Sequence, residues 1–408
     1  MNIIDIITKK KNNIELSKEE LEYAFNGYLR GDVQDYQMSS LLMAICLNGM
    51  SDTETFDLVD IFIKSGDVLD LSCIDGVKVD KHSTGGVGDK ITLIIGPIVS
   101  ACGVYVPKMS GRGLGITGGT IDKLESIKGF KVQLSEEEFI NQVKRIGFAV
   151  TGQTSNLCPL DKVIYALRDV TGTTDSIPLI ASSIMSKKIA GGAEKIFIDI
   201  KCGCGAMMKD TQSALKLKDL MERIGKFYNR ETICEIIDMN TPLGSNIGNS
   251  LEVIEAMDVL KGKNGTLRDL SIKISTEMIS IAKNISKSDA KKEVLNVLDS
   301  GIAYNKFLEF VKAQGGDINS LKVSSYVQEI KAKKSGIVKS INALNFGKLS
   351  CSLGAGRISK EDKIDYSVGI VLNKLLNTSV NLGDTLFTIY KKDDEEITLN
   401  INDYYEIK

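Results

Sequence analysis

The chain has 408 residues, of which 43% are hydrophobic and 25% are charged, and its formal net charge is −2. This length exceeds one ordinary hydrophobic core, so several domains are expected. The nearly balanced charge excludes a general field for nucleic acid or a membrane surface, and no apolar run approaches the ~20 residues that cross a bilayer. The first residues, Met1 to Asp5, lack the blocks of a signal peptide. We therefore expect a cytoplasmic protein with no nucleic-acid or membrane partner, which holds any anion through local groups.

The N-terminal 66 residues are predicted to be helical. Ser17 and Ser51 each begin a capping box that is followed by helical apolar spacing, and residues 35–48 supply a helix between them. Residues 160–168 and 177–190 are also predicted to be helices, with no strand of their own. We expect these two segments to return to the N-terminal helical domain and to make that domain discontinuous.

From residue 77 onward the pattern alternates between strands and helices. Short strands are predicted at 77–80 and 104–109, each followed by a glycine-rich loop, with an apolar helix over 91–101 between them. Ser135 opens another capped helix, which Gly147 closes, and further strands are predicted at 194–200 and 232–239. This alternation predicts a mainly parallel sheet with helices on both faces.

Beyond residue 331 the predicted segments are short and strand-like, at 336–341, 378–380 and 384–389. The expected fold class is therefore multidomain, α and α/β. It comprises a small helical domain (1–66 plus 160–190), a larger α/β domain with a mainly parallel sheet (67–159 plus 191–330), and a C-terminal α+β unit (331–408).

The first segment that indicates chemistry is Lys81-His82-Ser83-Thr84-Gly85-Gly86-Val87-Gly88-Asp89-Lys90, between a predicted strand and a predicted helix. Small residues at a helix start let backbone amides face an anion, and Lys81 and Ser83 add donors. The spacing of a P-loop is not met, and a purely structural turn is the alternative. His82 is the only histidine of the chain, so it cannot belong to a multi-histidine metal site. Inside this loop it is suited to proton donation or hydrogen bonding.

Two further segments carry clustered polar residues. The first is Ser110-Gly111-Arg112-Gly113-Leu114-Gly115-Ile116-Thr117-Gly118-Gly119-Thr120-Ile121-Asp122-Lys123-Leu124-Glu125. The second combines Tyr165 to Thr171 with Ala181 to Lys188, where Ser183 and Lys187 stand four residues apart and so share one helix face. On composition alone, Arg168 and Lys187 would be solvated surface charges.

With Ser-Gly-Arg-Gly at 110–113, Thr-Gly-Gly-Thr at 117–120 and Asp-x-Leu-Glu at 122–125, the chain resembles the thymidine and pyrimidine-nucleoside phosphorylase family. The likeness continues through 81–89, 165–171, 182–188 and 251–256. It covers most of the chain and weakens in the C-terminal tail.

The resemblance implies reversible phosphorolysis of uridine, thymidine and deoxyuridine to the free base and an α-D-(deoxy)ribose 1-phosphate. It implies no organic cofactor, inorganic phosphate as co-substrate, a homodimer formed through the helical domain, and domain closure by rotation. Catalysis would rest on His82, Arg168 and Lys187, and the pyrimidine would be held by these three residues and Ser183. The implied phosphate ligands are Lys81, Ser83, Thr92, Lys108, Met109, Ser110 and Thr120.

The chain departs from the family at several positions. Some relatives bind a monovalent cation, such as K⁺, with groups that match Gly88, Leu243, Asn246 and Glu255 and with a hydroxyl at the position of Lys90. The ammonium of Lys90 could replace that ion, and an exposed lysine at a helix start is the alternative. Ile116 stands where relatives commonly have histidine. Met207 and Thr174 also differ, and they leave the preference among pyrimidine nucleosides open.

Three other functions compete with this interpretation. One is a phosphorylase restricted to thymidine. Another is a phosphoribosyltransferase of related architecture, which would use magnesium and acidic ligands beside its glycine loops, whereas the one dense acidic run is Asp393 to Glu396 in the tail. The last is a non-catalytic nucleotide-binding protein, which would tolerate the loss of His82, Arg168 or Lys187.

Overall fold

The computed structural model describes residues 1–113, 118–154, 156–357, 359 and 362–408. The chain divides into two compact units. The first unit comprises Met1–Cys73, Gln153–Phe197 and Thr211–Glu235, and the second comprises Ile74–Gly152, Ile198–Asp210 and Ile236–Lys408. In the part of the chain that the structure describes, no helix is both long and apolar enough to pass through a bilayer.

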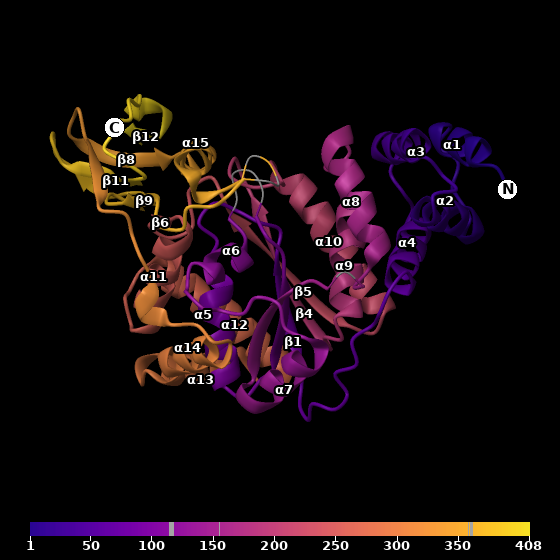
Figure 1. Cartoon of the computed structure of the whole chain (residues 1–408), viewed down its shortest axis with the longest axis horizontal. Coiled ribbons are helices and arrows are strands. Elements are labelled where there is room, and N and C mark those ends of the chain that lie inside the picture. The colour runs from indigo at the N-terminus through magenta and orange to yellow at the C-terminus, as the bar shows by residue number, and fades with distance from the viewer. Residues whose placement is uncertain (114–117, 155, 358, 360–361) are drawn as a thin grey trace. The chain divides into compact units, whose positions relative to one another are not determined.

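The first unit is mainly helical (Figure 1), and most of its helices share one apolar core. Ser17 and Ser51 cap their helices through complete capping boxes, as predicted. The core joins Phe25 and Phe62 to Leu160 and Leu179, so the segments after residue 153 pack on the N-terminal helices. The helices of this unit are α1 (Ile3–Lys11), α2 (Lys18–Arg30), α3 (Asp35–Asn48), α4 (Asp52–Lys64), α8 (Pro159–Thr171), α9 (Ile177–Ala190) and α10 (Thr211–Phe227).

The central strands form two sheets. One has the strand order β1 (Val79–Ser83), β4 (Lys195–Cys202), β5 (Glu231–Asp238), and the other pairs β2 (Val106–Ser110) with β3 (Phe148–Gly152). The β2–β3 pair is parallel, from Val106 opposite Phe148 to Ser110 opposite Gly152, which confirms the predicted parallel arrangement. A parallel bridge from Lys78 to Tyr105 places β2 beside β1.

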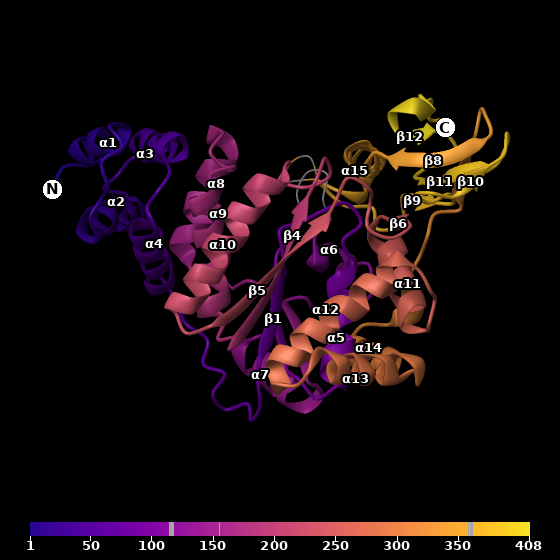
Figure 2. The same ribbon diagram turned by 180° about the vertical axis from the view of Figure 1, so that it is seen from behind.

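Helices of the second unit pack around α5 (Ile91–Ala101), which is apolar and almost wholly buried. Figure 2 shows it beside α12, α13 and α14, and all three helices contact it. Gly96 permits the approach of β3, because a Cβ there would lie 2.3 Å from the Phe148 ring. The other helices of this unit are α6 (Thr120–Glu125), α7 (Glu136–Ile146), α11 (Asn249–Leu260), α12 (Thr266–Lys283), α13 (Lys287–Asp299) and α14 (Ile302–Ala313).

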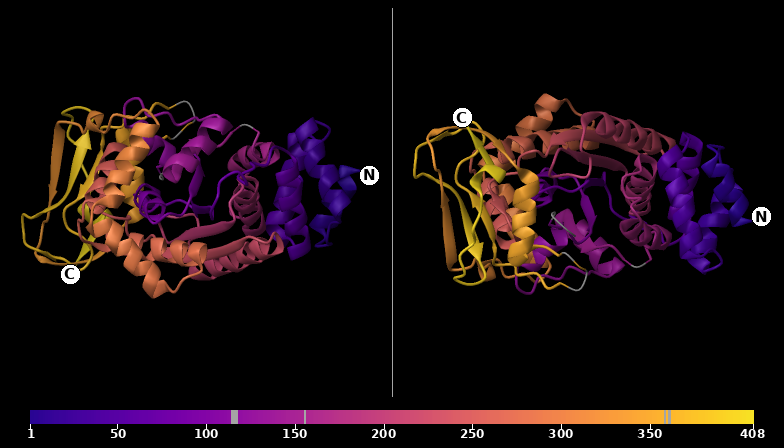
Figure 3. Two further views of the ribbon diagram at one scale, coloured as in Figure 1. Left: turned by 90° about the horizontal axis from the view of Figure 1, so that it is seen from below. Right: turned by 90° about the horizontal axis from the view of Figure 1, so that it is seen from above.

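The C-terminal region contains two small antiparallel sheets around an aromatic core that includes Phe346, Phe387 and Tyr405. Figure 3 shows its strands, coloured orange to yellow, gathered together. The sheet orders are β6-β9-β11-β7 and β10-β8-β12. The elements are β6 (Asn246–Ile247), β7 (Tyr326–Lys331), β8 (Gly336–Ile341), α15 (Ala343–Ser350), β9 (Gly369–Leu372), β10 (Ser379–Val380), β11 (Thr385–Lys391) and β12 (Tyr405–Ile407), with short turns η1 (Ile318–Ser320), η2 (Cys351–Ala355) and η3 (Ile401–Asp403).

The observed fold class agrees with the prediction, but one boundary at the site is wrong. The first strand was expected at 77–80, with His82 inside the following loop, whereas β1 runs from Val79 to Ser83. The strand continues because Thr84 keeps its backbone on β4, donating its N–H to the Asp199 carbonyl at 3.1 Å. Pairing with a strand more than a hundred residues away thus outweighs the local glycine signal.

Candidate active site

Two of the predicted phosphate segments end at the same edge of the central strands. Lys81 and Ser83 lie at the end of β1, and Lys108 and Ser110 lie at the end of β2. Val79 donates its N–H to the Tyr105 carbonyl at 2.9 Å, so the two strands run side by side. The carboxyl ends of parallel strands are the usual place for a ligand in α/β folds.

A buried row of opposite charges fixes Lys81. Its Nζ lies 2.7 Å from Oδ2 of Asp199, and the other oxygen of Asp199 lies 2.7 Å from Nζ of Lys201. Lys201 in turn lies 3.7 Å from Oδ2 of Asp89. All four side chains are nearly or fully buried. Burial by itself would lower the pKa of Lys81, but Asp199 and Asp89 raise it, so the ammonium stays charged.

Ser83 is held by the same row. Its Oγ donates to Oδ2 of Asp89 at 2.5 Å and accepts the N–H of Gly85 at 3.1 Å. Burial would raise the pKa of Asp89, yet the charges of Lys201 and Lys81 lower it well below its usual range. A phosphate that accepts from Ser83 must therefore compete with Asp89 for the hydroxyl proton.

Asp89, Asp199 and Lys201 were not among the predicted site residues. The available signal was the Asp-Ile-Lys step at 199–201 within an otherwise apolar buried strand, because charges in such a strand are rare unless paired. Their role depends on β4 lying beside β1, which residue spacing does not reveal.

The remaining predicted phosphate ligands also lie on described elements. Lys108 donates from Nζ to the Met109 carbonyl at 2.7 Å and lies 3.7 Å from Asp80. Thr92 is buried in the first turn of α5, and Thr120 begins α6. Residues 114–117, including Ile116, lie outside the described residues.

Lys90 is fully buried, which overturns the alternative of an exposed lysine at a helix start. Its Nζ donates to the carbonyls of Leu243 at 2.8 Å and Asn246 at 2.6 Å, and to Oε2 of Glu255 at 2.6 Å. The carbonyl of Gly88 accepts the backbone N–H of Lys90 at 3.0 Å. Three of the oxygens matched to a cation site thus surround one ammonium, and a metal ion cannot occupy the same point.

The first unit carries three of the four predicted pyrimidine residues, Arg168 on α8 and Ser183 and Lys187 on α9, whereas His82 lies on β1 of the second unit. Ser183 and Lys187 lie one turn apart on α9, as the spacing predicted. Nζ of Lys187 lies 2.7 Å from the buried carboxylate of Asp161, and Lys187 and Arg168 stand 5.9 and 5.8 Å from the centre of the Tyr165 ring. Asp161 was missed, because its only sequence signal is a charge near a helix start.

Arg168 is buried and stabilises the turn between α8 and α9. Its guanidinium donates to the carbonyls of Thr173, Thr174 and Leu179 at 2.9 to 3.2 Å. Three of its five N–H donors are thereby used, which leaves two for a ligand. Burial lowers the pKa of Arg168, and the nearby Asp161 acts against that change. The residue is therefore both a structural clamp and a charged donor.

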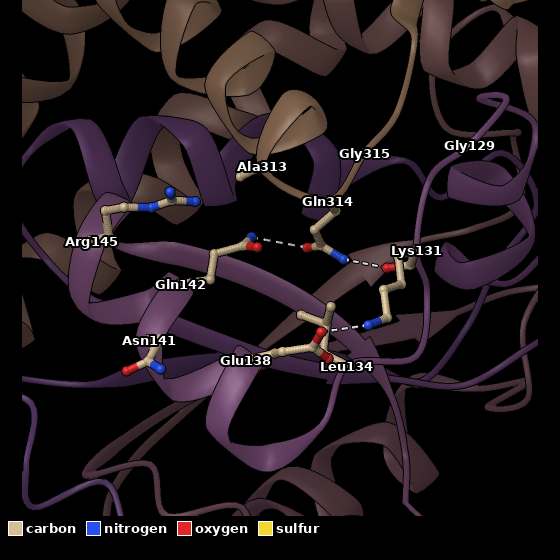
Figure 4. Close-up of a pocket in the computed structure, with 10 residues that line it drawn as sticks. All are labelled: Gly129, Lys131, Leu134, Glu138, Asn141, Gln142, Arg145, Ala313, Gln314 and Gly315. Carbon is tan, nitrogen blue, oxygen red and sulfur yellow. Dashed lines mark hydrogen bonds and ion pairs between the residues drawn. The ribbon is translucent and has the colours of Figure 1, made fainter.

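A cavity in the second unit does not coincide with the predicted site. It measures about 610 Å³ and lies between α7 and the end of α14 (Figure 4). Its wall includes Gln314, whose amide pairs with both the N–H and the carbonyl of Val150 on β3. None of its lining residues is a predicted ligand, so this cavity does not mark the predicted site. The lining residues are Gly129, Lys131, Leu134, Glu138, Asn141, Gln142, Arg145, Ala313, Gln314 and Gly315.

Three models of protein families together match most of the chain. Residues 4–66 match the helical bundle domain of a glycosyl transferase family, residues 75–304 match the α/β domain of that family, and residues 337–408 match a pyrimidine nucleoside phosphorylase C-terminal domain.

Similar curated proteins include the pyrimidine-nucleoside phosphorylases of Staphylococcus haemolyticus, Bacillus subtilis and Geobacillus stearothermophilus. They are 49%, 48% and 48% identical to the chain over 418, 417 and 403 residues. These alignments cover 100%, 100% and 97% of the chain, and 96%, 96% and 93% of the relatives. The crystal structure of anthranilate phosphoribosyltransferase from Thermus thermophilus has a TM-score of 0.59 at 17% identity, and the match covers 76% of this chain and 99% of that one. That likeness shows a shared fold alone.

Proposed function

Because the chain belongs to the glycosyl transferase family of the pyrimidine-nucleoside phosphorylases, we propose that it catalyses the reversible phosphorolysis of uridine, thymidine and deoxyuridine. The products are the free pyrimidine and an α-D-ribose or α-D-deoxyribose 1-phosphate. The observation that carries this proposal is the buried Lys81–Asp199 pair at the end of β1, which holds a charged ammonium where the anionic co-substrate is expected. Neither magnesium nor a diphosphate donor is needed for this reaction, unlike that of a phosphoribosyltransferase.

In the proposed reaction, inorganic phosphate is held by Lys81, Ser83 and Ser110, with Thr92, Lys108, Met109 and Thr120 around them. A phosphate oxygen forms a bond to C1′ of the sugar on the α face, while the bond from C1′ to N1 of the base breaks. The electron pair of that bond leaves with the pyrimidine, which becomes anionic. A compact ammonium and several hydroxyl donors suit a phosphate nucleophile.

The departing pyrimidine is stabilised by positive charge. Arg168 has two N–H donors beyond those that hold its turn, and Lys187 is aligned by Asp161. Donors fixed in a poorly solvated site stabilise charge that develops in the transition state. Ser183 adds a hydroxyl one turn away on α9. His82, next to Lys81 on β1, supplies the hydrogen bond and the proton for the oxygen of the base.

We propose that the ammonium of Lys90 takes the place of the monovalent cation that some relatives bind. Its three oxygen partners at 2.6 to 2.8 Å support this assignment, because together they match most of the expected cation ligands. The positive charge would then be part of the chain, and activity would not require added K⁺.

A homodimer is the proposed assembly. On α3, Tyr36, Met43 and Leu47 recur at helical spacing and are 71%, 39% and 78% exposed. Such an apolar stripe is typical of a surface that another chain covers. Leu47→Glu should convert a dimer into monomers in sedimentation velocity, whereas Leu382→Glu, at a leucine that is 69% exposed, should not. A wild-type monomer at micromolar concentration would contradict this assembly.

The reaction is tested by incubating the protein with uridine, thymidine or deoxyuridine, with and without phosphate, and following base release. We expect release from all three nucleosides that depends on phosphate, and none from inosine, a purine nucleoside. Release from thymidine and deoxyuridine but not uridine would instead support a restricted phosphorylase. The absence of phosphate-dependent release from every pyrimidine nucleoside would reject the proposed function.

A further inference from the structure

The carboxylate of Asp122 bridges two glycines, Gly113 and Gly119, of the glycine-rich segment 110–125. Its Oδ2 accepts the backbone N–H of Gly113 at 2.6 Å and that of Gly119 at 3.2 Å. The two glycines also touch, because a Cβ at Gly119 would lie 2.2 Å from the Gly113 nitrogen. Asp122 is 1% exposed, so water does not compete for its hydrogen bonds to the two backbone amides.

The joint formed by Gly113, Gly119 and Asp122 lies between Ser110 and Thr120, two of the proposed phosphate ligands. Ser110 ends β2 three residues before Gly113, and Thr120 follows Gly119 directly. Because both amides bind one carboxylate, the backbone that follows Ser110 and the backbone that precedes Thr120 are held in fixed positions. A shift at the joint changes the distance between the two hydroxyl groups.

Arg357 completes the joint from a distant part of the chain. Its Nη1 donates to Oδ1 of Asp122 at 2.7 Å, and its side chain is 12% exposed. Arg112 lies farther from the same oxygen, at 3.4 Å, and is engaged through both terminal nitrogens with Glu125. Arg357 is thus the closer cation of Asp122, and without it only Arg112, at 3.4 Å and shared with Glu125, would remain beside the buried carboxylate.

The neighbourhood of Arg357 is itself anchored. The Tyr366 hydroxyl donates to Oε2 of Glu125 at 3.2 Å, and the Tyr366 carbonyl accepts the N–H of Ser250 at 3.2 Å. Asn249 donates from its amide to the Ala355 carbonyl at 2.8 Å. The C-terminal region is therefore bonded both to α6 and to the start of α11.

We propose that Asp122 and Arg357 are positioning residues for the phosphate co-substrate, an inference that rests on the proposed function. They touch neither phosphate nor nucleoside. Together they fix the positions of Ser110 and Thr120 relative to one another, and they link these positions to the C-terminal region.

The test uses Arg357→Gln in the full-length protein, with Arg357→Lys as the conservative variant. Arg268→Gln is the matched control, because Arg268 is 13% exposed and pairs with Asp299 at 2.6 Å. We expect Arg357→Gln to raise the KM for phosphate about tenfold, as for the loss of one charged hydrogen bond to a buried acceptor. The KM for uridine should change by less than about twofold, because only the phosphate side loses an interaction. Arg357→Lys should lie between, and Arg268→Gln should match wild type.

A second measurement does not depend on activity. Hydrogen exchange of the amides of Gly113 and Gly119 should be faster in Arg357→Gln than in wild type, and unchanged in Arg268→Gln. An unchanged exchange rate, or an equal rise in both KM values, would overturn the proposed role. If the wild-type protein released no base, the proposed function would fail, while the exchange data would still decide whether Arg357 fastens the joint.

Discussion

The carboxylate of Asp199 lies 2.7 Å from the ammonium of Lys81, and both side chains are buried. Asp199 also pairs with Lys201, so one carboxylate serves two lysines. A buried ammonium keeps its proton only with such a partner, because burial alone favours the neutral amine. The charge that the co-substrate needs therefore depends on Asp199 as much as on Lys81.

Asp199→Asn should make phosphate use dependent on pH. Since Asp199 raises the pKa of Lys81 against burial, its removal lets that pKa fall, and Lys81 loses its proton as the pH increases. We expect the KM for phosphate to rise about tenfold at pH 8, and less at pH 6, relative to wild type. Initial rates with varied phosphate at both pH values measure this change.

Glu54→Gln provides the control for Asp199→Asn. Lys10 and Glu54 form another buried pair at 2.7 Å, in the first unit. Both variants should lose about 3 kcal/mol of unfolding free energy or more, because Glu54→Gln leaves one buried lysine without its partner and Asp199→Asn leaves two. Only Asp199→Asn should alter the KM for phosphate, and an equal change in both would refute a specific role for Asp199.

Lys187→Met should impair catalysis and should also destabilise the first unit, because it leaves the buried carboxylate of Asp161 without its partner. The side chain of Lys187 is 21% exposed, and in the proposed reaction it stabilises the anionic pyrimidine. We expect kcat/KM for uridine to fall about a hundredfold, as for the loss of one preorganised donor. Lys306→Met, at a lysine equally exposed and also paired at 2.7 Å, should retain wild-type rates. Comparable losses in the two variants would argue against Lys187 as a catalytic residue.

Lys90→Thr should convert the protein into one that responds to K⁺. Removing the ammonium leaves two carbonyls and the Glu255 carboxylate around a space that a monovalent cation can fill. The variant should lose thermal stability in sodium or choline buffer and regain part of it in potassium, and base release should follow the same trend. Wild-type activity that rose steeply with K⁺ would rule out Lys90 as the substitute.

Glu255 should make stability depend on pH in the acidic range. Burial would raise the pKa of its carboxyl, but Lys90 and Ser245 lower it below the ordinary value of 4.5. A group with a lowered folded-state pKa contributes its stability above the unfolded-state value and loses it as the pH falls through the folded-state value. Urea unfolding should therefore show the advantage of wild type over Glu255→Gln intact at pH 7 and decreasing below about pH 4.5. A constant difference from pH 7 to pH 3.5 would contradict this linkage.

Local signals in the sequence predicted many individual elements. Ser17, Ser51 and Ser135 were identified as helix caps from four-residue patterns, and all three accept the expected backbone N–H. The helix over 177–190 was also placed correctly, which fixed Ser183 and Lys187 on one face. These features depend on residues a few positions apart, so the sequence contains them directly.

Features that depend on distant contacts escaped prediction. The extension of β1 to His82 and Ser83 requires β4, and the role of Asp122 requires Arg357, which lies 235 residues away. Strand β3 and helices α10 to α14 were not predicted either, although they contain much of the apolar core. Residue spacing carries no information on which buried charges meet, and the pairs around Asp199 therefore emerged only from the structure.

The two-residue strand β6 has a consequence for anyone who would shorten this protein or exchange its parts. Asn246 pairs with Val371 in the C-terminal sheet, and the carbonyl of Asn246 accepts a hydrogen bond from the ammonium of Lys90. A truncated chain that ended before β7 would leave the edge of β6 exposed and remove the neighbour that orients this carbonyl. A chimera would have to exchange residues 246–247 together with the C-terminal region. The part to be exchanged is therefore not one continuous stretch of the sequence.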